Sequence, residues 1–468
     1  MADVPVSLPR ARAEPARARA AERFLSRGRL AALVPVALFA LTFDLAVVQD
    51  DGTVYFDFLA RVLGDPTQAR AVAYQFGSAF WTLPFYLASK LVALRGGFDG
   101  YHSAEVATTV AANAALLVCL YAGWRILREL DLPRGPAVLL TTLFGTPLFY
   151  YGVLQPSYKH AADALYATVG FWFVLRATLP GARRRDYAAA GVCLALMLAT
   201  RYANVALCVP ALAVLTAFRF RRAAAWIAGV GAVTCVLVFA LPIVRHVPYD
   251  QPPNIYAAGD GPAWLAPAGV RSALGTSSIV DPVLRGSELD PAAPLKMLFT
   301  LHRGLFVWTP LTILATAGFV LLARRDRAHR PFLLSLGLGA LGLLAIHAFW
   351  GRQWDGGGSF SQRFLTALFP FFLVGAAEFL RRARRPGVAA ASLCACFSLF
   401  VGLVLFNGYY RQSAHDSITQ VLGHFGGLTG PRTSRFHRPP PADSVENLGR
   451  DLGDRISGRW ELYWRLVT

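Results

Sequence analysis

Two neighbouring carboxylates stand where they could act as a base. Asp50 and Asp51 follow a run of apolar residues, and Tyr55 and Asp57 come shortly after them. A carboxylate that is partly withdrawn from water can accept a proton near neutral pH, as a general base does. Two acids can also simply end a helix in water, and the spacing alone leaves both interpretations open.

Basic residues occur at the ends of several other apolar runs. They are Lys159, His160, Arg201, His302, Arg303 and Arg363. A single arginine or lysine in such a place is explained by a long side chain that reaches toward the lipid headgroups. Several of them at one level, facing an acidic loop, favour a different interpretation, in which the cations hold a lipid phosphate by charge-assisted hydrogen bonds.

The segment from Trp350 to Arg363 has an unusual composition for a loop. It contains a second tryptophan, Trp354, the acid Asp355 and three successive glycines. Glycines allow the backbone to approach a ligand closely, and the aromatic rings and charges offer the stacking faces and polar groups that suit a sugar. The alternative is a flexible linker, but flexible linkers are rich in Gly and Ser and do not usually carry two tryptophans.

The elements that position these residues are apolar. The chain has 468 residues, of which 55% are hydrophobic and 16% charged, with a mean hydropathy of +0.43. Soluble domains carry about 25% charged residues, so an ordinary soluble enzyme or a disordered chain is excluded. The net charge of +18 comes from arginines in short runs between long apolar stretches, which indicates a polytopic membrane protein rather than a nucleic-acid-binding one.

A membrane span needs about 20 mainly apolar residues. The sequence predicts an all-α, polytopic transmembrane bundle of about eleven spans. Nine of them are predicted at 30–48, 103–124, 136–154, 160–180, 223–244, 304–323, 331–349, 363–380 and 388–407. The remaining two come from 187–218, which we interpret as two short helices forming a V with Arg201 at the turn.

The arginines also predict the orientation, because short cytoplasmic loops are rich in basic residues. A cytoplasmic, Arg-rich N-terminus at 1–29 places every arginine-dense short loop on the same side, but only if 187–218 is a V. The transmembrane domain is then 30–407. Its outer parts are predicted to be the loops 49–102, 245–297 and 350–362, with an extracytoplasmic tail at 408–468. Within the first loop, 71–94 is predicted to form an amphipathic helix at the membrane surface.

Four sequence elements, in this order, resemble a known family. They are the segments 74–87, 200–202, 303–310 and 354–364. Together with the Arg-rich N-terminus and the acidic first outer loop, they resemble the GT-C superfamily of polyprenyl-phosphate-sugar-dependent glycosyltransferases. The likeness is to bacterial multipass members and to protein O-mannosyltransferases of the family 39 type, and it extends from about residue 30 to 407.

The resemblance implies an inverting glycosyltransferase of the bacterial plasma (inner) membrane, with its active site on the extracytoplasmic face. The catalytic base would be Asp50 or Asp51, and the donor phosphate would bind Lys159, His160, Arg201 and Arg363. We expect the substrates to contact Tyr55, Asp57, His302, Arg303, Trp350, Trp354 and Asp355. The partners would be a polyprenyl-phosphate-linked sugar, the bilayer, and a glycan, lipid or protein acceptor. No nucleic-acid partner, cofactor or metal site is predicted, although some relatives use a divalent metal.

Two other functions fit part of the pattern. A transporter or lipid flippase would place its acids and bases near the middle of the bilayer and would show related halves, and no such repeat is visible. A non-catalytic relative that binds polyprenyl lipid would share the fold without the activity.

Overall fold

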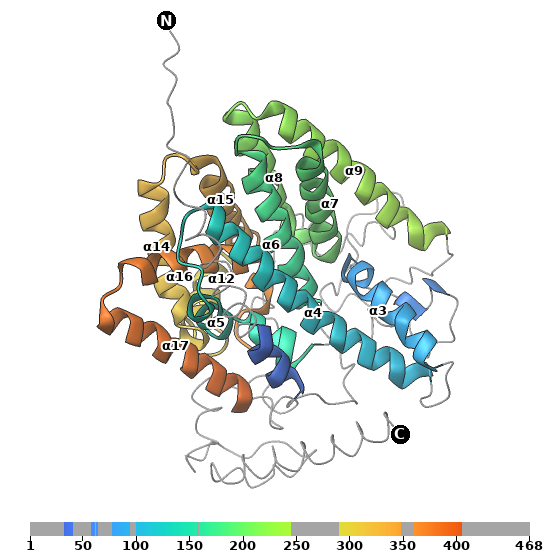
Figure 1. Ribbon diagram of the computed structural model, residues 1–468, viewed down its shortest axis with the longest axis horizontal. Helices are drawn as coiled ribbons and strands as arrows, with labels where there is room; N and C mark the ends of the chain where they lie inside the picture. The colour runs from blue at the N-terminus through green and yellow to red at the C-terminus, as the bar shows by residue number, and fades with distance from the viewer. Residues whose placement is uncertain are drawn as a thin grey trace, which may run out of the picture.

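A computed structural model describes residues 32–40, 58–60, 62–63, 77–93, 100–156, 159–244, 290–347 and 360–404. Throughout these ranges the chain forms helices and the turns that connect them (Figure 1). Inside a bilayer each backbone N–H and C=O must find a partner within the protein, which a helix provides along its own length. The predicted all-α, polytopic membrane bundle is confirmed; the number of spans stays a prediction.

The bundle is built from helices that follow one another along the chain. The α-helices are α3 (Gly77–Ala93), α4 (Gly100–Glu129), α5 (Pro136–Phe144), α6 (His160–Ala177), α7 (Arg184–Thr200), α8 (Val205–Ala217), α9 (Arg221–Val244), α12 (Ala293–Phe299), α13 (Leu305–Trp308), α14 (Leu311–Arg325), α15 (Arg330–Ile346), α16 (Phe369–Arg382) and α17 (Arg385–Val404). Three short irregular helices connect them: η1 (Tyr150–Leu154), η2 (Tyr202–Asn204) and η4 (Arg363–Leu368).

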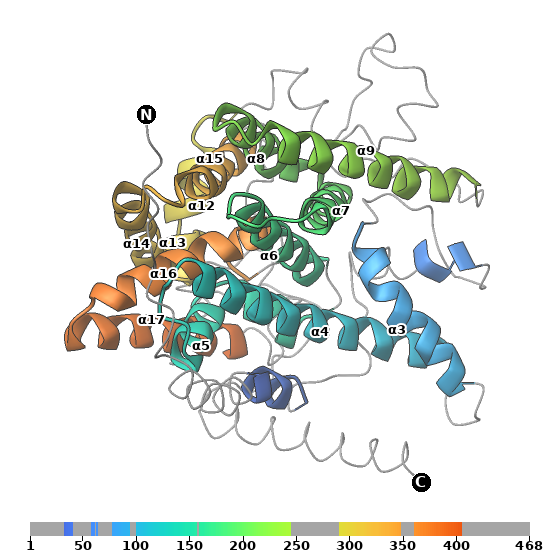
Figure 2. The same cartoon turned by 45° about the horizontal axis from the view of Figure 1, so that its top comes forward.

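Four helical stretches of the described part are long and apolar enough to cross a membrane. They are Val106–Glu129, Arg221–Leu241, Arg363–Arg382 and Arg385–Leu403. Two of these stretches, within α9 and α17, lie at the periphery of the bundle, as Figure 2 shows, and only 17% and 28% of them are buried inside the protein. The predicted helix at 71–94 is confirmed over Gly77–Ala93, and the predicted first span is helical over 32–40.

The V predicted at 187–218 is confirmed. Helix α7 ends at Thr200, Arg201 is extended (φ −154°, ψ 120°), and η2 leads directly into α8. The Asn204 side chain donates a hydrogen bond to the carbonyl oxygen of Met197 at 3.0 Å. The same carbonyl oxygen also accepts the backbone N–H of Arg201 at 3.1 Å, so Asn204, the residue before α8, adds a second hydrogen bond at the end of α7 and ties the two helices together.

Two predicted spans are not continuous helices, and here the sequence prediction was wrong. In the first, 136–154, helix α5 stops at Phe144, and the chain passes Gly145 and Pro147 before η1. In the second, 304–323, α13 ends at Trp308 and α14 begins after Pro310. Proline has no N–H to donate and its ring collides with the carbonyl one turn earlier, so each proline stands where the helix breaks.

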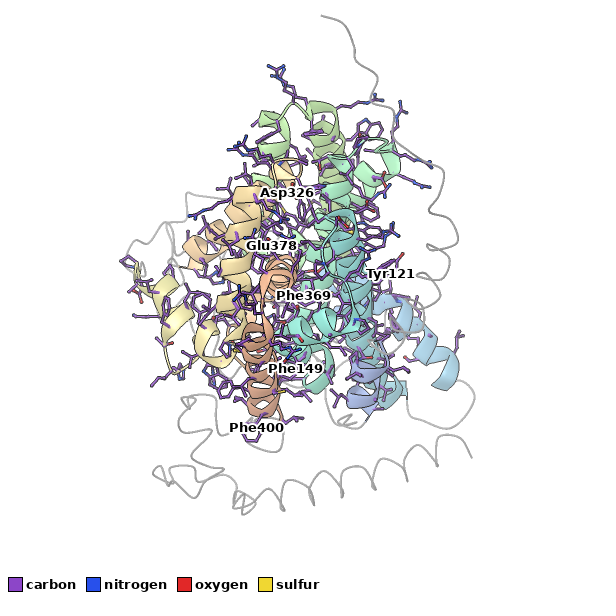
Figure 3. All side chains as sticks on the ribbon, turned by 60° about the vertical axis from the view of Figure 1, so that its left-hand side comes forward. Tyr121, Phe149, Asp326, Phe369, Glu378 and Phe400 are labelled. Carbon is purple, nitrogen blue, oxygen red and sulfur yellow. The ribbon has the colours of Figure 1, made fainter. Side chains whose placement is uncertain are left out.

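Successive helices run in alternating directions and give the bundle two distinct ends. One end, which we call the arginine end, carries the arginines at the ends of α4, α6, α14 and α16 and at the starts of α7, α9, α15 and α17. The other, the site end, carries η1, the start of α6, the α7–α8 junction and η4. Figure 3 shows Asp326 and Glu378 toward one end and Phe149 and Phe400 toward the other, with Phe369 between them.

A buried carboxylate joins two helices at the arginine end. Glu378 of α16 is fully buried and accepts hydrogen bonds from Arg381 at 2.7 and 2.8 Å and from Arg382 at 2.6 Å. Arg325, at the end of α14, lies 3.9 Å from the same carboxylate. One turn earlier, Gly375 packs directly against the α14 backbone, leaving no room for a Cβ atom. Small residues allow helices to pack this closely inside a membrane.

Candidate active site

Two buried guanidinium groups lie on one aromatic ring at the site end. Arg201 of the α7–α8 junction is 2% exposed, and Arg363 at the start of η4 is 9% exposed. The Cζ atoms of Arg201 and Arg363 lie 4.6 and 5.3 Å from the centroid of the Phe364 ring. Arg201 also donates a hydrogen bond from Nη1 to the carbonyl oxygen of Phe364 at 2.8 Å. Residues 162 positions apart are therefore brought together in one cluster, and both had been predicted to bind the donor phosphate.

His160 belongs to the same cluster. It begins α6, is 2% exposed, and its Nδ1 lies 3.4 Å from the hydroxyl of Thr366 in η4. Its ring contacts that of Tyr151 at 4.6 Å between centroids. The positive charges of Arg363, Arg201 and Lys159 all act on this imidazole. The other three residues predicted to bind phosphate thus all lie within electrostatic range of His160.

Asp163 is a functional candidate that the sequence analysis did not identify. Its carboxylate is fully buried on α6, 3.8 Å from Nη1 of Arg201, and accepts a hydrogen bond from Asn204 at 2.6 Å. An acid inside an apolar span is costly unless it is paired, so its position one turn after His160 was a usable signal. Asn204 orients the Asp163 carboxylate, and that carboxylate in turn faces the Arg201 guanidinium.

The chain around η1 forms the aromatic wall of the cluster. The backbone of Phe360 donates to the Tyr151 hydroxyl at 3.0 Å, and the same hydroxyl lies 3.2 Å from the Phe360 carbonyl oxygen. The next residue, Ser361, is fully buried with a φ of 50°, which is uncommon for a residue other than glycine. Strained backbone and single π-helical turns such as η1 are both enriched at functional sites. The hydrogen bonds between Tyr151 and Phe360 fix the chain three residues before Arg363.

Arg303 lies beside this aromatic wall. It is fully buried, with its Cζ atom 4.6 Å from the Trp308 ring centroid. The Trp308 ring in turn contacts Phe360 edge to face at 5.8 Å between centroids. His302 occupies the same turn and is half-buried. The predicted substrate-binding role of these two residues stays a prediction. Arg303 contacts Trp308, and through this ring it is connected to Phe360, three residues before Arg363.

The predicted base and several predicted sugar contacts lie outside the described residues. They are Asp50, Asp51, Tyr55, Asp57, Trp350, Trp354 and Asp355. Over the ranges that the structure does describe, no three His, Cys, Asp or Glu side chains are grouped so that they could hold a metal ion.

Gly77 of α3 packs against the last turn of α7, directly before Arg201. It is the first residue of α3, and its carbonyl oxygen accepts a hydrogen bond from Tyr166 of α6 at 3.3 Å. A Cβ atom at residue 77 would lie 2.6 Å from the backbone of both Ala199 and Leu196, in the last turn of α7. Helix α3 therefore packs directly against the backbone that precedes Arg201.

We expect Gly77→Ala to separate α3 from α7 and to destabilise the protein by about 2 kcal/mol, the usual cost of overpacking. The detergent-solubilised protein should show a lower melting temperature and a larger loss of activity than stability alone explains. Gly229→Ala is the matched control, because a Cβ atom at residue 229 of α9 meets nothing within 4 Å. Equal melting temperatures for the two variants would contradict this packing.

Similar solved structures are known, although no protein-family model matches the chain and no curated protein sequence matches it. ArnT from Cupriavidus metallidurans, solved with bound undecaprenyl phosphate, is 15% identical over 93% of this chain and 75% of its own, with a TM-score of 0.50. The archaeal oligosaccharyltransferase AglB from Archaeoglobus fulgidus, in complex with an inhibitory peptide and a dolichol-phosphate, is 14% identical over 84% of this chain, with a TM-score of 0.47. The matched region spans 56% of AglB.

Proposed function

We propose that this chain, which has the fold of the GT-C superfamily of membrane glycosyltransferases, is itself a membrane glycosyltransferase. It would move a sugar from a polyprenyl-phosphate donor to an acceptor hydroxyl on the extracytoplasmic face, with inversion at the anomeric carbon. The acceptor would be a glycan, a lipid or a protein. ArnT was solved with undecaprenyl phosphate, and we extend this ligand class to the present chain as part of the proposal.

The observation that carries this proposal is the buried cluster at the site end. Arg201, Arg363 and His160 come from three separate segments, and each is at most 9% exposed. Burying charged groups is costly, and the cost is recovered when hydrogen bonds and opposite charges are well placed. Both guanidinium groups lie on the Phe364 ring, and Arg201 is also held by Asp163 and by the Phe364 carbonyl. Two cations placed in this way are preorganised for an oxyanion such as a phosphate.

The chemistry needs few groups. The acceptor oxygen attacks the anomeric carbon, the bond from that carbon to the phosphate oxygen breaks, and the lipid phosphate leaves with the electron pair. The acceptor proton passes to a carboxylate, for which Asp50 or Asp51 is the candidate. Arg201 and Arg363 would stabilise the charge that develops on the departing phosphate oxygen. The polyprenyl tail would lie between the helices, below the cluster.

The direct test is an assay with the purified chain, a radiolabelled polyprenyl-phosphate sugar and candidate acceptors. We expect loss of label from the donor and a product of inverted anomeric configuration. Uptake of donor or sugar into sealed vesicles without any covalent product would instead identify a transporter. Binding of polyprenyl phosphate without turnover, over a broad set of sugars and acceptors, would identify a non-catalytic lipid-binding protein.

The proposed orientation can be tested on intact cells. Residue 270 lies in the loop 245–297, which we place outside the plasma membrane. A Val270→Cys variant should react with a membrane-impermeant thiol reagent before lysis, at a level above that of the parent chain. Labelling that appears only after lysis would reverse the orientation and would place the site end in the cytoplasm.

The proposed chemistry also makes a prediction about metal removal. The leaving group is already a phosphate and the cluster supplies guanidinium groups, so we expect chelation with EDTA to leave at least about half of the activity. The control is the same preparation dialysed without chelator. Complete loss that one divalent metal restores would show that the chemistry depends on a metal ion.

A further inference from the structure

Six exposed arginines form a patch at the arginine end that the proposed reaction does not use. The arginine patch consists of Arg183, Arg184 and Arg185 at the start of α7, and Arg219, Arg221 and Arg222 at the turn from α8 to α9. The blue nitrogen tips of side chains around the green helices in Figure 3 mark this part of the molecule. The two triplets are separated by more than thirty residues but are neighbours in space.

Close packing of α7 against α9 brings the two triplets together. A Cβ atom at Gly191 of α7 would lie 2.7 Å from the carbonyl oxygen of Ile227 in α9, so the backbones touch within two turns of both helix starts. Arg184 then reaches across to α9, with its Cζ atom 5.5 Å from the ring centroid of Trp226. Because both helices begin here, the positive ends of two helix dipoles add to the six guanidinium charges.

The described carboxylates at this end form ion pairs with other arginines rather than with the six of the patch. Across the described ranges, no carboxylate lies within 4.0 Å of any of the six guanidinium groups. The acid next to the first triplet, Asp186, is 3% exposed and is engaged by Arg176 at 3.1 Å and by the backbone N–H of Arg183 at 2.9 Å. By contrast, Arg325, Arg381 and Arg382 gather around Glu378.

The patch also lies where the lipid-facing surface of α9 begins. Val233, Val236 and Leu237, further along α9, are 60%, 67% and 66% exposed, as expected of a helix that faces hydrocarbon. Phe218 and Trp226, each 39% exposed, stand between that apolar surface and the arginines. Aromatic side chains at such a boundary favour the headgroup level of a bilayer. The six guanidinium groups therefore lie beyond the apolar surface of α9, where the headgroups of a surrounding bilayer are expected.

We propose that the arginine patch is a binding site for anionic phospholipid headgroups of the adjacent leaflet. The excess of basic residues in short cytoplasmic loops is general, but it does not require six of them to meet in one place with no ion-paired carboxylate among the described residues. Guanidinium groups bind phosphate through paired hydrogen bonds, and the neighbouring aromatic rings and α9 surface accommodate the acyl chains. This proposal does not depend on the proposed transferase activity.

The test uses the full-length chain in neutral detergent, with phosphatidylglycerol as the probe and phosphatidylcholine as the uncharged reference. Native mass spectrometry gives the apparent affinity, and the melting temperature gives an independent readout. We expect phosphatidylglycerol to bind and to raise the melting temperature, while phosphatidylcholine does neither. In Arg184→Gln/Arg221→Gln/Arg222→Gln the affinity should fall by at least about ten-fold, since each arginine near a charged membrane surface contributes about five-fold.

The matched control removes three arginines elsewhere at the same end, Arg324→Gln/Arg327→Gln/Arg330→Gln. Its affinity should stay within about two-fold of the parent chain. An equal loss of affinity in both variants would show that the arginine patch is not a specific lipid-binding site. Stabilisation by inorganic phosphate alone, to the same extent as by the lipid, would identify a site for soluble anions instead. If the glutamine variant does not fold, the binding of phosphatidylglycerol to the parent chain is measured at increasing salt concentration. The affinity should fall as salt rises, and binding that salt does not weaken would overturn the proposal.

Discussion

The double change Asp50→Asn/Asp51→Asn should reduce sugar transfer by at least about 100-fold, since a general base contributes about 100- to 10,000-fold to a reaction of this kind. Asparagine keeps the shape of the side chains but cannot accept the acceptor proton. The loss should appear in kcat, whereas binding of polyprenyl phosphate should remain within a few-fold of the parent chain. The measurement is the rate of product formation at saturating donor.

The single variants separate the two acids. If one of them is the base, its asparagine variant should reproduce the loss of the double variant, and the other should retain most of the activity. Asp57→Asn, a nearby carboxylate to which we assign substrate contact only, is the matched control. Transfer that survives the double change would show that the base lies elsewhere.

The second large effect is expected at Arg201. Arg201→Gln removes a guanidinium that is 2% exposed, contacts Asp163 at 3.8 Å and lies on Phe364. Removing one preorganised donor that stabilises a developing oxyanion costs about 100- to 1,000-fold in rate. We expect the donor KM to rise and kcat to fall, with the acceptor KM little changed. Equal effects on donor and acceptor would contradict a contact with the lipid phosphate.

Two further variants test how Arg201 is held. Asp163→Asn should lower kcat less than Arg201→Gln does, because the guanidinium remains but loses the carboxylate that orients it. Arg176→Gln is the matched control. Arg176 is an ion-paired arginine on the same helix as Asp163, 3.1 Å from Asp186 at the arginine end. Its loss should affect the melting temperature rather than the donor KM. A change in donor KM in Arg176→Gln would show that the Arg201 result reflects general damage.

Most of the architecture could be predicted from the sequence, because the lengths of the apolar segments and the positions of the arginines are read from it directly. The V at Arg201 could be predicted since only two helices there keep every arginine-rich loop on one side. The breaks at Gly145–Pro147 and at Pro310 were missed because hydropathy measures lipid solubility and not backbone geometry. Gly145 has a second role at the first break: a Cβ atom there would collide with the Leu311 side chain, so close packing against the start of α14 requires a glycine.

The candidate site could be predicted only where charge stood out against an apolar background. Arg201, His160 and Arg363 were visible for this reason, and the structure brings them together. Tyr151 and Phe360 could not be found, since their hydrogen bonds join positions 209 residues apart and neither residue is conspicuous in an aromatic-rich chain. Asp163 was findable, because a carboxylate within an apolar span is rare and functional by default.

The central claim is that the cluster of His160, Arg201 and Arg363 receives the phosphate of a polyprenyl lipid. The most direct measurement is an experimental structure of the chain with bound undecaprenyl phosphate. We expect the phosphate oxygens to lie about 2.8 Å from the guanidinium nitrogens of Arg201 and Arg363, the distance of a charge-assisted hydrogen bond. A lipid phosphate bound away from these three residues, with the cluster still closed around Phe364, would contradict it.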